Sequence, residues 1–243
     1  MNPIAISAIH QFHEKNNAIL ISINGWMMPK RYVGIKDELE IVENFVGIHD
    51  ISSKVKLILN GDDVFQILSE KAEVISELNR KVMLMRSFKY GFEFILAKLT
   101  NNQYLILTDQ QFKNTVTQIC QKDISCVDIT SGLTGIRLIG PKSRDTICAI
   151  SSFDIRDKVF PDLSVAQISV MHQHAYLFRT DIKDKLCYDI FVAREIGLYV
   201  WNQIITLGNP MGIAPIGTQV MDGIISPTKY RIQIWDIKCF KLI

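Results

Sequence analysis

The amino-acid sequence predicts an α+β fold in which two similar α/β subdomains pack around a pseudo-twofold axis. The first observation is an internal repeat, because the order Asp-Ile-Ser/Thr, strand, turn, helix occurs twice in the chain. The second is that each copy leads to a further strand followed by a helix. The third is turn chemistry, since Asn-Gly in one copy and Gly-Pro in the other separate the first strand from its helix. Two such halves would leave a cleft between them, a favoured place for a small ligand.

The first half starts with the sequence Asp-Ile-Ser-Ser at residues 50–53. A strand over 55–59 and a helix that begins at Asp62 are predicted to follow. Near the end of this half, the run Tyr-Leu-Ile-Leu at 104–107 predicts another strand, and apolar residues at helical spacing over 112–119 predict a helix after it.

The second half repeats this pattern from the sequence Asp-Ile-Thr-Ser at residues 128–131. A strand is predicted over 133–139, and a helix begins at Lys142 after Gly-Pro. The run Tyr-Asp-Ile-Phe at 188–191 predicts the closing strand, and residues 198–205 predict the helix that follows it.

The segments outside the repeat are predicted more simply. Asn2-Pro3 is typical of a helix start, and Ile4, Ala8 and Phe12 share one helical face, so a first helix is expected from Pro3 until Asn16-Asn17 stops it. A strand is expected over 18–23 and a second helix over 36–45, which Gly47 ends.

We expect residues 1–220 to form one domain, with its two halves at about residues 50–120 and 128–206. No linker-like stretch interrupts this part of the chain. Residues 221–243 are expected to form a C-terminal tail or a short strand, with a last strand over 230–237.

Composition narrows the class of protein. The 243 residues carry 27 basic and 25 acidic side chains, so a net charge of +2 gives no field that would attract nucleic acid or an anionic membrane. No apolar run is long enough for a membrane span, and the first residues predict no signal peptide. The five cysteines are odd in number and include no CxxC pair, which favours free thiols in the cytoplasm.

Two strings of residues point to a family. The first runs from His13 through Gly-Trp-Met-Met-Pro at 25–29 to Asp-Ile-Ser at 50–52, and the second is Leu-Ile-Gly-Pro-Lys-Ser-Arg at 138–144. Their order and content resemble the glycine-cleavage T-protein (aminomethyltransferase) family. The resemblance covers about residues 10–220 and implies the folate-binding fold of that family, without the β-barrel domain that follows it in relatives. It also implies tetrahydrofolate as a cofactor and transfer of a one-carbon unit onto it.

The resemblance makes Glu93 the candidate catalytic residue. In the family, an aspartate in a glycine-rich hairpin lies near the nitrogen of tetrahydrofolate that accepts the one-carbon unit. Aligned from the following strand, Glu93 takes this position, although the glycines are missing. The residues alone leave an alternative open, in which Glu93 is a strand residue that points to solvent between Phe92 and Phe94.

The resemblance also implies a set of cofactor-binding residues. The family uses a glutamate at the end of a glycine-rich hairpin to accept hydrogen bonds from the pterin ring, and Asp189 takes that position after Tyr188 and Arg179. The alternative for Asp189 is a surface ion pair with Lys183 or Lys185.

Two further residues complete the set of cofactor-binding candidates. Lys54 stands where the family has an apolar side chain that lines the ligand site. Trp26 is shared with the family, and it either contacts the ligand or packs between the subdomains. No metal site is expected, because the pair His172 and His174 has no cysteine or carboxylate cluster beside it.

Two hypotheses about function follow. In the first, the chain is a T-protein-like tetrahydrofolate-binding protein of one-carbon metabolism that transfers an aminomethyl or methyl group. In the second, it is a non-catalytic folate-binding or scaffold subunit of a larger complex, similar to the small subunit of sarcosine oxidase. Folate is the expected ligand, and a lipoyl carrier protein or another protein subunit is the candidate partner. Gln219, where the family has an arginine that helps to hold the ligand, favours the second hypothesis.

Overall fold

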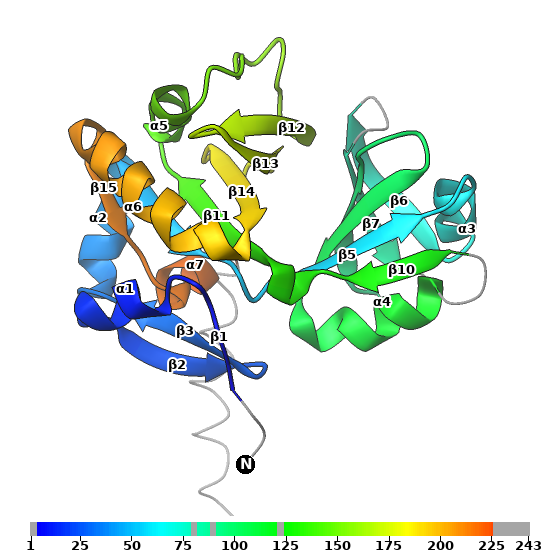
Figure 1. Ribbon diagram of the computed structural model, residues 1–243, viewed down its shortest axis with the longest axis horizontal. Helices are drawn as coiled ribbons and strands as arrows, with labels where there is room; N and C mark the ends of the chain where they lie inside the picture. The colour runs from blue at the N-terminus through cyan, green and yellow to red at the C-terminus, as the bar shows by residue number, and fades with distance from the viewer. Residues whose placement is uncertain (1–3, 79–81, 88–90, 121–123, 226–243) are drawn as a thin grey trace, which may run out of the picture.

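The computed structural model describes residues 4–78, 82–87, 91–120 and 124–225, and its elements form two six-stranded sheets, one three-stranded sheet and the helices that cover them. The two large sheets lie in opposite halves of the molecule and are joined where β5 and β11 leave the centre (Figure 1). The predicted α+β fold with two α/β subdomains is confirmed.

The sheet of the first half has the strand order β10-β5-β9-β8-β7-β6, and all its pairs are antiparallel. Its strands are β5 (Val55–Asn60), β6 (Ala72–Leu78), β7 (Val82–Ser87), β8 (Glu93–Lys98), β9 (Gln103–Thr108) and β10 (Ser125–Asp128). One face is covered by α3 (Val64–Ser69), η1 (Gln110–Phe112) and α4 (Lys113–Cys120). Val55, Leu57 and Leu59 alternate along β5 and bury their side chains under these helices.

The sheet of the second half has the order β12-β13-β14-β11-β4-β15. Its strands are β4 (Val46–Asp50), β11 (Leu133–Ile139), β12 (Ser164–Val170), β13 (Gln173–Arg179), β14 (Cys187–Ala193) and β15 (Ile213–Pro215). The 3-10 turns η3 (Arg194–Ile196) and η4 (Asn209–Met211) connect elements of this half, and η2 (Thr130–Gly132) joins β10 of the first sheet to β11. Helices α5 (Ser143–Ile150) and α6 (Gly197–Gly208) cover one face, where Trp201 is fully buried. Helices α2 (Ile35–Asn44) and α7 (Thr218–Ile225) pack on the other face beside Ile139 and Cys187.

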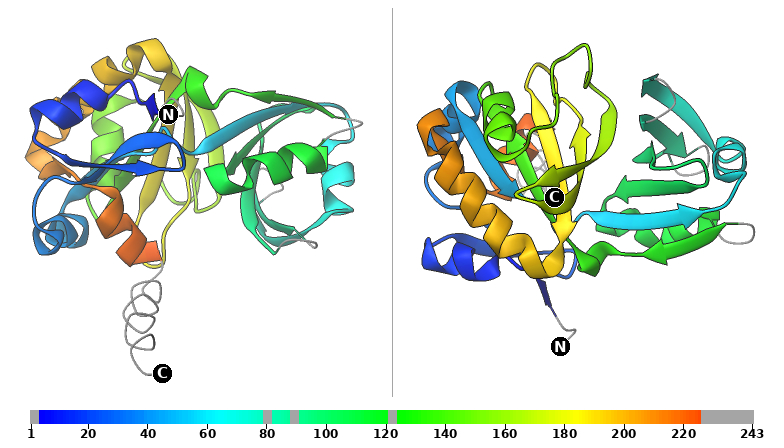
Figure 2. Two further views of the ribbon diagram at one scale, coloured as in Figure 1. Left: turned by 90° about the horizontal axis from the view of Figure 1, so that it is seen from below. Right: turned by 45° about the horizontal axis from the view of Figure 1, so that its top comes forward.

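The N-terminal segment forms a small sheet in the order β1-β3-β2, which lies with α1 beside the second half (Figure 2). Its elements are β1 (Ala5–Ile6), α1 (His10–Lys15), β2 (Ile19–Ile23) and β3 (Trp26–Arg31). The predicted helix from Pro3 to Asn16-Asn17 is therefore wrong in its first part, although it ends where expected, at Lys15 with Asn16 as its C-cap. Residues 5 and 6 pair with β3, with the amide of Ala5 donating to the carbonyl of Gly25 over 2.8 Å, and the helix begins only at His10.

The strand order is the same in the two halves. Strands β5, β9, β8 and β7 of the first half correspond to β11, β14, β13 and β12 of the second. Each sheet also contains one strand that directly precedes the first strand of the other half in the chain. Strand β10 precedes β11 but pairs with β5, and β4 precedes β5 but pairs with β11. The predicted limits of the two halves stay predictions, as does the domain boundary at residue 220, which α7 crosses.

Two short connections, the crossover segments 51–54 and 129–132, carry the chain between the halves. Their hydrogen bonds match. The Ser52 hydroxyl accepts from the amide of Gly135 over 3.2 Å, and the Thr130 hydroxyl accepts from the amide of Lys56 over 3.1 Å. The repeated Asp-Ile-Ser/Thr sequence therefore serves the crossing of the two halves, because each hydroxyl satisfies a backbone donor of the opposite strand.

Apolar side chains fill much of the space where the two sheets face each other. Phe178 and Phe191 of the second sheet belong to one buried cluster with Leu105 and Leu107 of the first. Phe178 and Phe191 meet edge to face, with ring centroids 5.7 Å apart. The expected cleft is thus closed near the crossing, and any ligand site must lie beside this cluster.

Within the described ranges, no helix has both the length and the apolar character needed to cross a membrane. The predicted strand over 230–237 lies outside the described residues.

Candidate ligand-binding site

A pocket of about 300 Å³ lies beside the crossover segments, on the face of the second sheet that α7 covers. Five parts of the chain surround it: the crossover segment 51–54 with the end of β4, the start of η1, the turn between β2 and β3, β11, and α7. The lining residues used below are His49, Ser53, Lys54, Asp109 and Arg137. The volume is at the lower end of what small-molecule sites enclose.

Arg137 and Asp189 form a buried ion pair at the base of this pocket. Arg137 of β11 donates from Nε and Nη2 to the two carboxylate oxygens of Asp189 on β14, each over 2.7 Å. The side chains are only 11% and 4% exposed. Burial by itself would lower the pKa of Arg137, but the nearby Asp189 carboxylate raises it well above its usual value, so the guanidinium stays charged. This two-pronged geometry is the strong form of an arginine–carboxylate contact.

His49 lies next to this pair on β4. Its Nδ1 is 3.1 Å from the carbonyl oxygen of Ile216, and because a carbonyl only accepts, Nδ1 carries the ring proton. Burial, helped by the charge of Arg137, lowers the pKa of His49 to about 4. The imidazole is therefore neutral at pH 7, and its Nε2 holds a lone pair.

Strand register brings these side chains into one line. His49 is directly opposite Arg137 in the pairing of β4 with β11, and Arg137 is directly opposite Asp189 in the pairing of β11 with β14. Directly paired residues project from the same face of a sheet. We call His49, Arg137 and Asp189 the polar row.

The rim of the pocket carries a second ion pair, which comes from the first half. The ammonium of Lys54 lies 2.9 Å from the Asp109 carboxylate, and both side chains are substantially exposed. The side-chain amide of Gln110 donates from Nε2 to the carbonyl of Ser53 over 2.9 Å and ties η1 to the crossover segment. An exposed pair of this kind stabilises the fold by less than about 1 kcal/mol, so Lys54 can exchange Asp109 for a ligand at little cost.

Only some of the residues predicted from the sequence lie at this pocket. Lys54 lines it, whereas Asp189 is not among the lining residues and is bound by Arg137, which is. The surface pair of Asp189 with Lys183 or Lys185 is wrong, because Asp189 is 3% exposed and both its oxygens bind Arg137. Lys185 instead lies 2.9 Å from the carboxylate of Glu43.

Arg179 and Tyr188 lie on the opposite face of the second sheet. They are the sequence neighbours of Phe178 and Asp189, and successive side chains of a strand point to opposite faces. Arg179 is 8% exposed and pairs with Asp157 over 2.6 Å and Asp181 over 2.8 Å. Its guanidinium is 5.9 Å from the centre of the Tyr188 ring.

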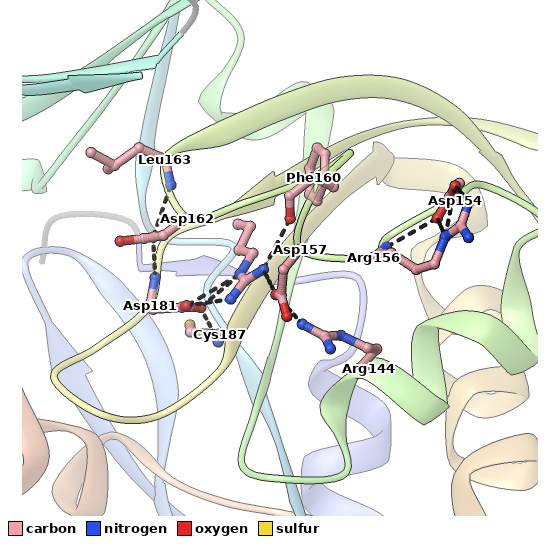
Figure 3. A network of polar contacts seen from close by, with 10 residues as sticks. Arg144, Asp154, Arg156, Asp157, Phe160, Asp162, Leu163, Asp181 and Cys187 are labelled. Carbon is pink, nitrogen blue, oxygen red and sulfur yellow. Dashed lines mark hydrogen bonds and ion pairs between the residues drawn. The ribbon is translucent and has the colours of Figure 1, made fainter. Parts of the chain in front are cut away.

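The acidic partners of Arg179 also join neighbouring parts of the fold. Asp157 also pairs with Arg144, and the Asp181 amide donates to Asp162 (Figure 3). This network fastens the loop between α5 and β12 to the hairpin after β13, and it does not line the pocket.

Trp26 and Glu93 also lie away from the pocket. Trp26 begins β3 and is 6% exposed, consistent with a packing role. Glu93 begins β8 as an exposed residue and is not among the residues that line the pocket. Its neighbours Phe92 and Phe94 pack in the core under the helices, as expected for side chains on the opposite face of the strand.

Several residues of the family-like opening string form one buried network. The Asp50 carboxylate lies 2.9 Å from Nε2 of His13, and Nδ1 of His13 lies 2.6 Å from the Tyr32 hydroxyl. Glu38 accepts from the amides of Tyr32 and Gly217 over 2.6 and 2.9 Å. Burial alone would raise the pKa of Asp50, but the hydrogen bond with His13 holds it below its usual value. These residues fix the N-terminal segment and the start of α7 around β4, which shapes the pocket from behind.

Sequence reasoning missed Arg137 and His49 as site residues. Arg137 had a visible signal, since a charged residue inside the apolar run 133–139 needs a buried partner. Its partner could not be named, because Asp189 is 52 residues away along the chain. His49 gave no such signal, because a lone histidine in a strand is more often a packing residue.

Comparison with known proteins relates the whole chain to one family. The family model for the GCVT N-terminal domain matches residues 9–238. An aminomethyltransferase from Flavobacterium psychrophilum is 20% identical over 226 residues, which are 89% of this chain and 62% of the relative. Sarcosine oxidase subunit alpha from a Corynebacterium species is 22% identical over 91% of this chain and 26% of that subunit. The chain spans about three fifths of the length of the aminomethyltransferase it matches.

Solved structures show the same fold. The glycine cleavage system aminomethyltransferase T from Bartonella henselae superposes with a TM-score of 0.72 at 15% identity, covering 91% of this chain and 62% of that one. A chain of the heterotetrameric sarcosine oxidase from Corynebacterium sp. U-96 gives a TM-score of 0.51 at 12% identity, over 71% of this chain and 88% of that one.

Proposed function

The chain belongs to the GCVT N-terminal domain family, and from this premise we propose that it is a tetrahydrofolate-binding protein of one-carbon metabolism. The observation that carries the proposal is the pocket beside the crossover segments, whose base holds a bidentate buried ion pair. A fixed guanidinium in a half-enclosed pocket provides the few oriented polar groups by which such sites recognise a ligand.

Three of the predicted cofactor-binding residues act indirectly in this proposal. Asp189 holds Arg137 in place, so it is a positioning residue. Arg179 and Tyr188 stiffen the second sheet from its other face, where their contacts order the loops at the strand ends. Lys54 at the rim can bind the anionic tail of a folate, because its present partner Asp109 is exposed.

Calorimetric titration with tetrahydrofolate tests the proposal. We expect saturable heat with one site per chain. Ser53→Trp should abolish this heat, because Ser53 lines the pocket and an indole would fill it. Ser69→Trp, on the exposed end of α3, is the matched control and should bind like the wild type. No heat at millimolar tetrahydrofolate would overturn folate binding.

The second candidate function is a non-catalytic subunit of a larger complex. The exposed position of Glu93, outside the pocket, favours it over a transferase that uses Glu93 as its catalytic carboxylate. A separate groove of about 660 Å³ along α2 and α7, with Ile35, Leu39 and Gln219 in its lining, offers a protein partner an apolar surface. A lipoyl carrier protein or another subunit is the partner class in this proposal.

An assay of aminomethyl transfer to tetrahydrofolate separates the two candidates. Transfer that falls about a hundredfold or more in Glu93→Gln would establish the catalytic version. Folate binding without transfer would establish the subunit. We place either function in the cytoplasm, where the unbridged thiols of Cys126, Cys148 and Cys187 would stay reduced.

A further inference from the structure

We propose that His49 and Arg137 form the recognition edge of the pocket, and that they select a ligand with a carbonyl oxygen next to an N–H group. This inference rests on the proposed function and deepens it. For a folate, the matching group is the lactam edge of a 4-oxopterin ring. It differs from recognition by a free carboxylate, which the position of Asp189 in the sequence first suggested.

Arg137 can act only as a donor in this pocket. Two of its nitrogens, Nε and Nη2, are occupied by Asp189. The remaining nitrogen, Nη1, has no hydrogen-bond partner among the residues that the structure describes, and the side chain lines the pocket. A guanidinium has no lone pair to offer, so it requires an acceptor such as a carbonyl oxygen.

His49 supplies a hydrogen-bond acceptor. Its Nδ1 proton is used by the carbonyl of Ile216, which leaves Nε2 as an acceptor. Because its pKa is lowered to about 4, the ring stays neutral at physiological pH and Nε2 keeps its lone pair. Among the described residues, none donates to this nitrogen, so it requires an N–H from a ligand.

The two groups stand side by side. His49 and Arg137 are directly paired residues on antiparallel strands, whose Cα atoms are about 4.5–5.5 Å apart and whose side chains leave the same face. Asp189 follows on the next strand in the same line, but both its oxygens are committed to Arg137. The polar row therefore presents an acceptor and a donor as neighbours, with no free carboxylate in the row. The other carboxylates that line the pocket belong to Asp50, Asp109 and Asp222, and Asp50 is bonded to His13 while Asp109 is paired with Lys54.

This arrangement distinguishes two closely similar ligands. A 4-oxopterin presents the O4 acceptor beside the N3–H donor, which pairs with Arg137 and His49. A 4-aminopterin presents an amino donor beside an unprotonated N3 acceptor, so the positions of the donor and the acceptor are reversed. With the reversed edge, an N–H group would face the guanidinium and a lone pair would face Nε2. Both mismatches leave buried polar groups without partners, which costs far more than losing a favourable contact.

Calorimetric titration at pH 8 with folic acid and with aminopterin, its 4-amino analogue, tests the inference. We expect aminopterin to bind at least tenfold more weakly than folic acid. In His49→Leu this ratio should fall at least threefold but stay above one, because Arg137 still prefers the O4 acceptor, whereas His49→Gln, whose side-chain oxygen can accept, should restore part of it. His174→Leu, at an exposed position on β13 outside the pocket lining, is the matched control and should keep the wild-type ratio. Circular dichroism melting of each variant shows whether it folds.

Each outcome decides the question. Equal binding of the two compounds to the wild type would overturn the recognition edge and leave folate binding intact. Preference for aminopterin would also overturn it, because that result requires a free carboxylate at the edge. Binding of neither compound would overturn the proposed function together with this inference. A folded His174→Leu variant that loses the ratio would also overturn it, because selection would then not depend on the polar row.

Discussion

Arg137 holds both carboxylate oxygens of Asp189 at 2.7 Å, from a strand that is directly paired with the strand of Asp189. The pair is largely buried, so each charge depends on the other for its solvation. Asp189 by itself could accept hydrogen bonds from a ligand, but here both its oxygens bind Arg137 and hold this donor in place. The chemistry that the pocket offers to a ligand follows from this one contact.

Breaking this pair should destabilise the protein strongly. Arg137→Met leaves a buried carboxylate, and Asp189→Leu leaves a buried guanidinium, so each should lower the free energy of unfolding by about 3–5 kcal/mol. The double variant Arg137→Met/Asp189→Leu should lose much less than the sum, because no unpaired charge remains. Urea denaturation followed by circular dichroism measures all three. Additive losses would contradict a coupled pair, and Arg156→Ala in the exposed Arg156–Asp154 pair is the control and should leave stability nearly unchanged.

The buried His49 should make stability depend on pH in the acid range. Its pKa is about 4 in the folded protein, against 6.5 for the free side chain. Between these values the unfolded chain binds a proton that the folded protein does not. The free energy of unfolding should therefore fall by about 3 kcal/mol from pH 6.5 to pH 4, while the contribution is fully present above pH 6.5.

Urea denaturation across this pH range checks the effect of His49. His49→Leu should flatten the fall, whereas His174→Leu, at an exposed position on β13, should keep it. A wild-type slope that survives in His49→Leu would mean that other groups cause the pH dependence.

The two crossover hydroxyls should contribute equally to stability. Ser52→Ala and Thr130→Ala each remove the acceptor of one backbone amide from the opposite half, over similar distances of 3.2 and 3.1 Å. Each should lower the free energy of unfolding by about 1–3 kcal/mol, the cost of leaving a buried donor unpaired. The neighbouring variants Ser53→Ala and Ser131→Ala are controls and should be close to neutral. If only one hydroxyl mattered, the two crossings would not be equivalent.

Glu93→Gln should leave the affinity for tetrahydrofolate unchanged within about twofold. The side chain is exposed and lies outside the set that lines the pocket. Calorimetric titration of the variant beside the wild type measures this. A tenfold loss of affinity would show that Glu93 reaches the ligand, and it would restore the residue as the candidate catalytic carboxylate.

The repeat could be read from the sequence because it rests on local patterns. Asp50 and Asp128 each precede the same hydroxyl-bearing turn, and each turn leads into a strand of alternating or continuous apolar residues. Strand β11 was predicted with its observed limits, and α2 within one residue at either end. The first helix was misjudged because pairing of residues 5 and 6 with β3 outweighed their helical spacing, and such pairing is a tertiary effect.

The candidate site was harder to predict because it depends on register. Asp189 was singled out by its place in a family-like string, but its function depends on Arg137, a residue brought opposite it by sheet pairing. Alternation predicts which residues of one strand share a face, yet it does not say which residue of another strand they meet. Arg179 and Asp189 lie on opposite faces for the same reason.

The central claim is that the ligand binds against His49 and Arg137, and nuclear magnetic resonance of the His49 ring nitrogens tests it most directly. In ¹⁵N-labelled protein, saturation with folic acid should move the Nε2 resonance of His49 as this nitrogen accepts a hydrogen bond. The Nδ1 resonance, already bonded to the carbonyl of Ile216, should stay nearly constant. The ring of the exposed His174 on β13 should not change. Saturable folate binding with an unchanged Nε2 resonance would contradict the account, because the ligand would then bind elsewhere on the protein.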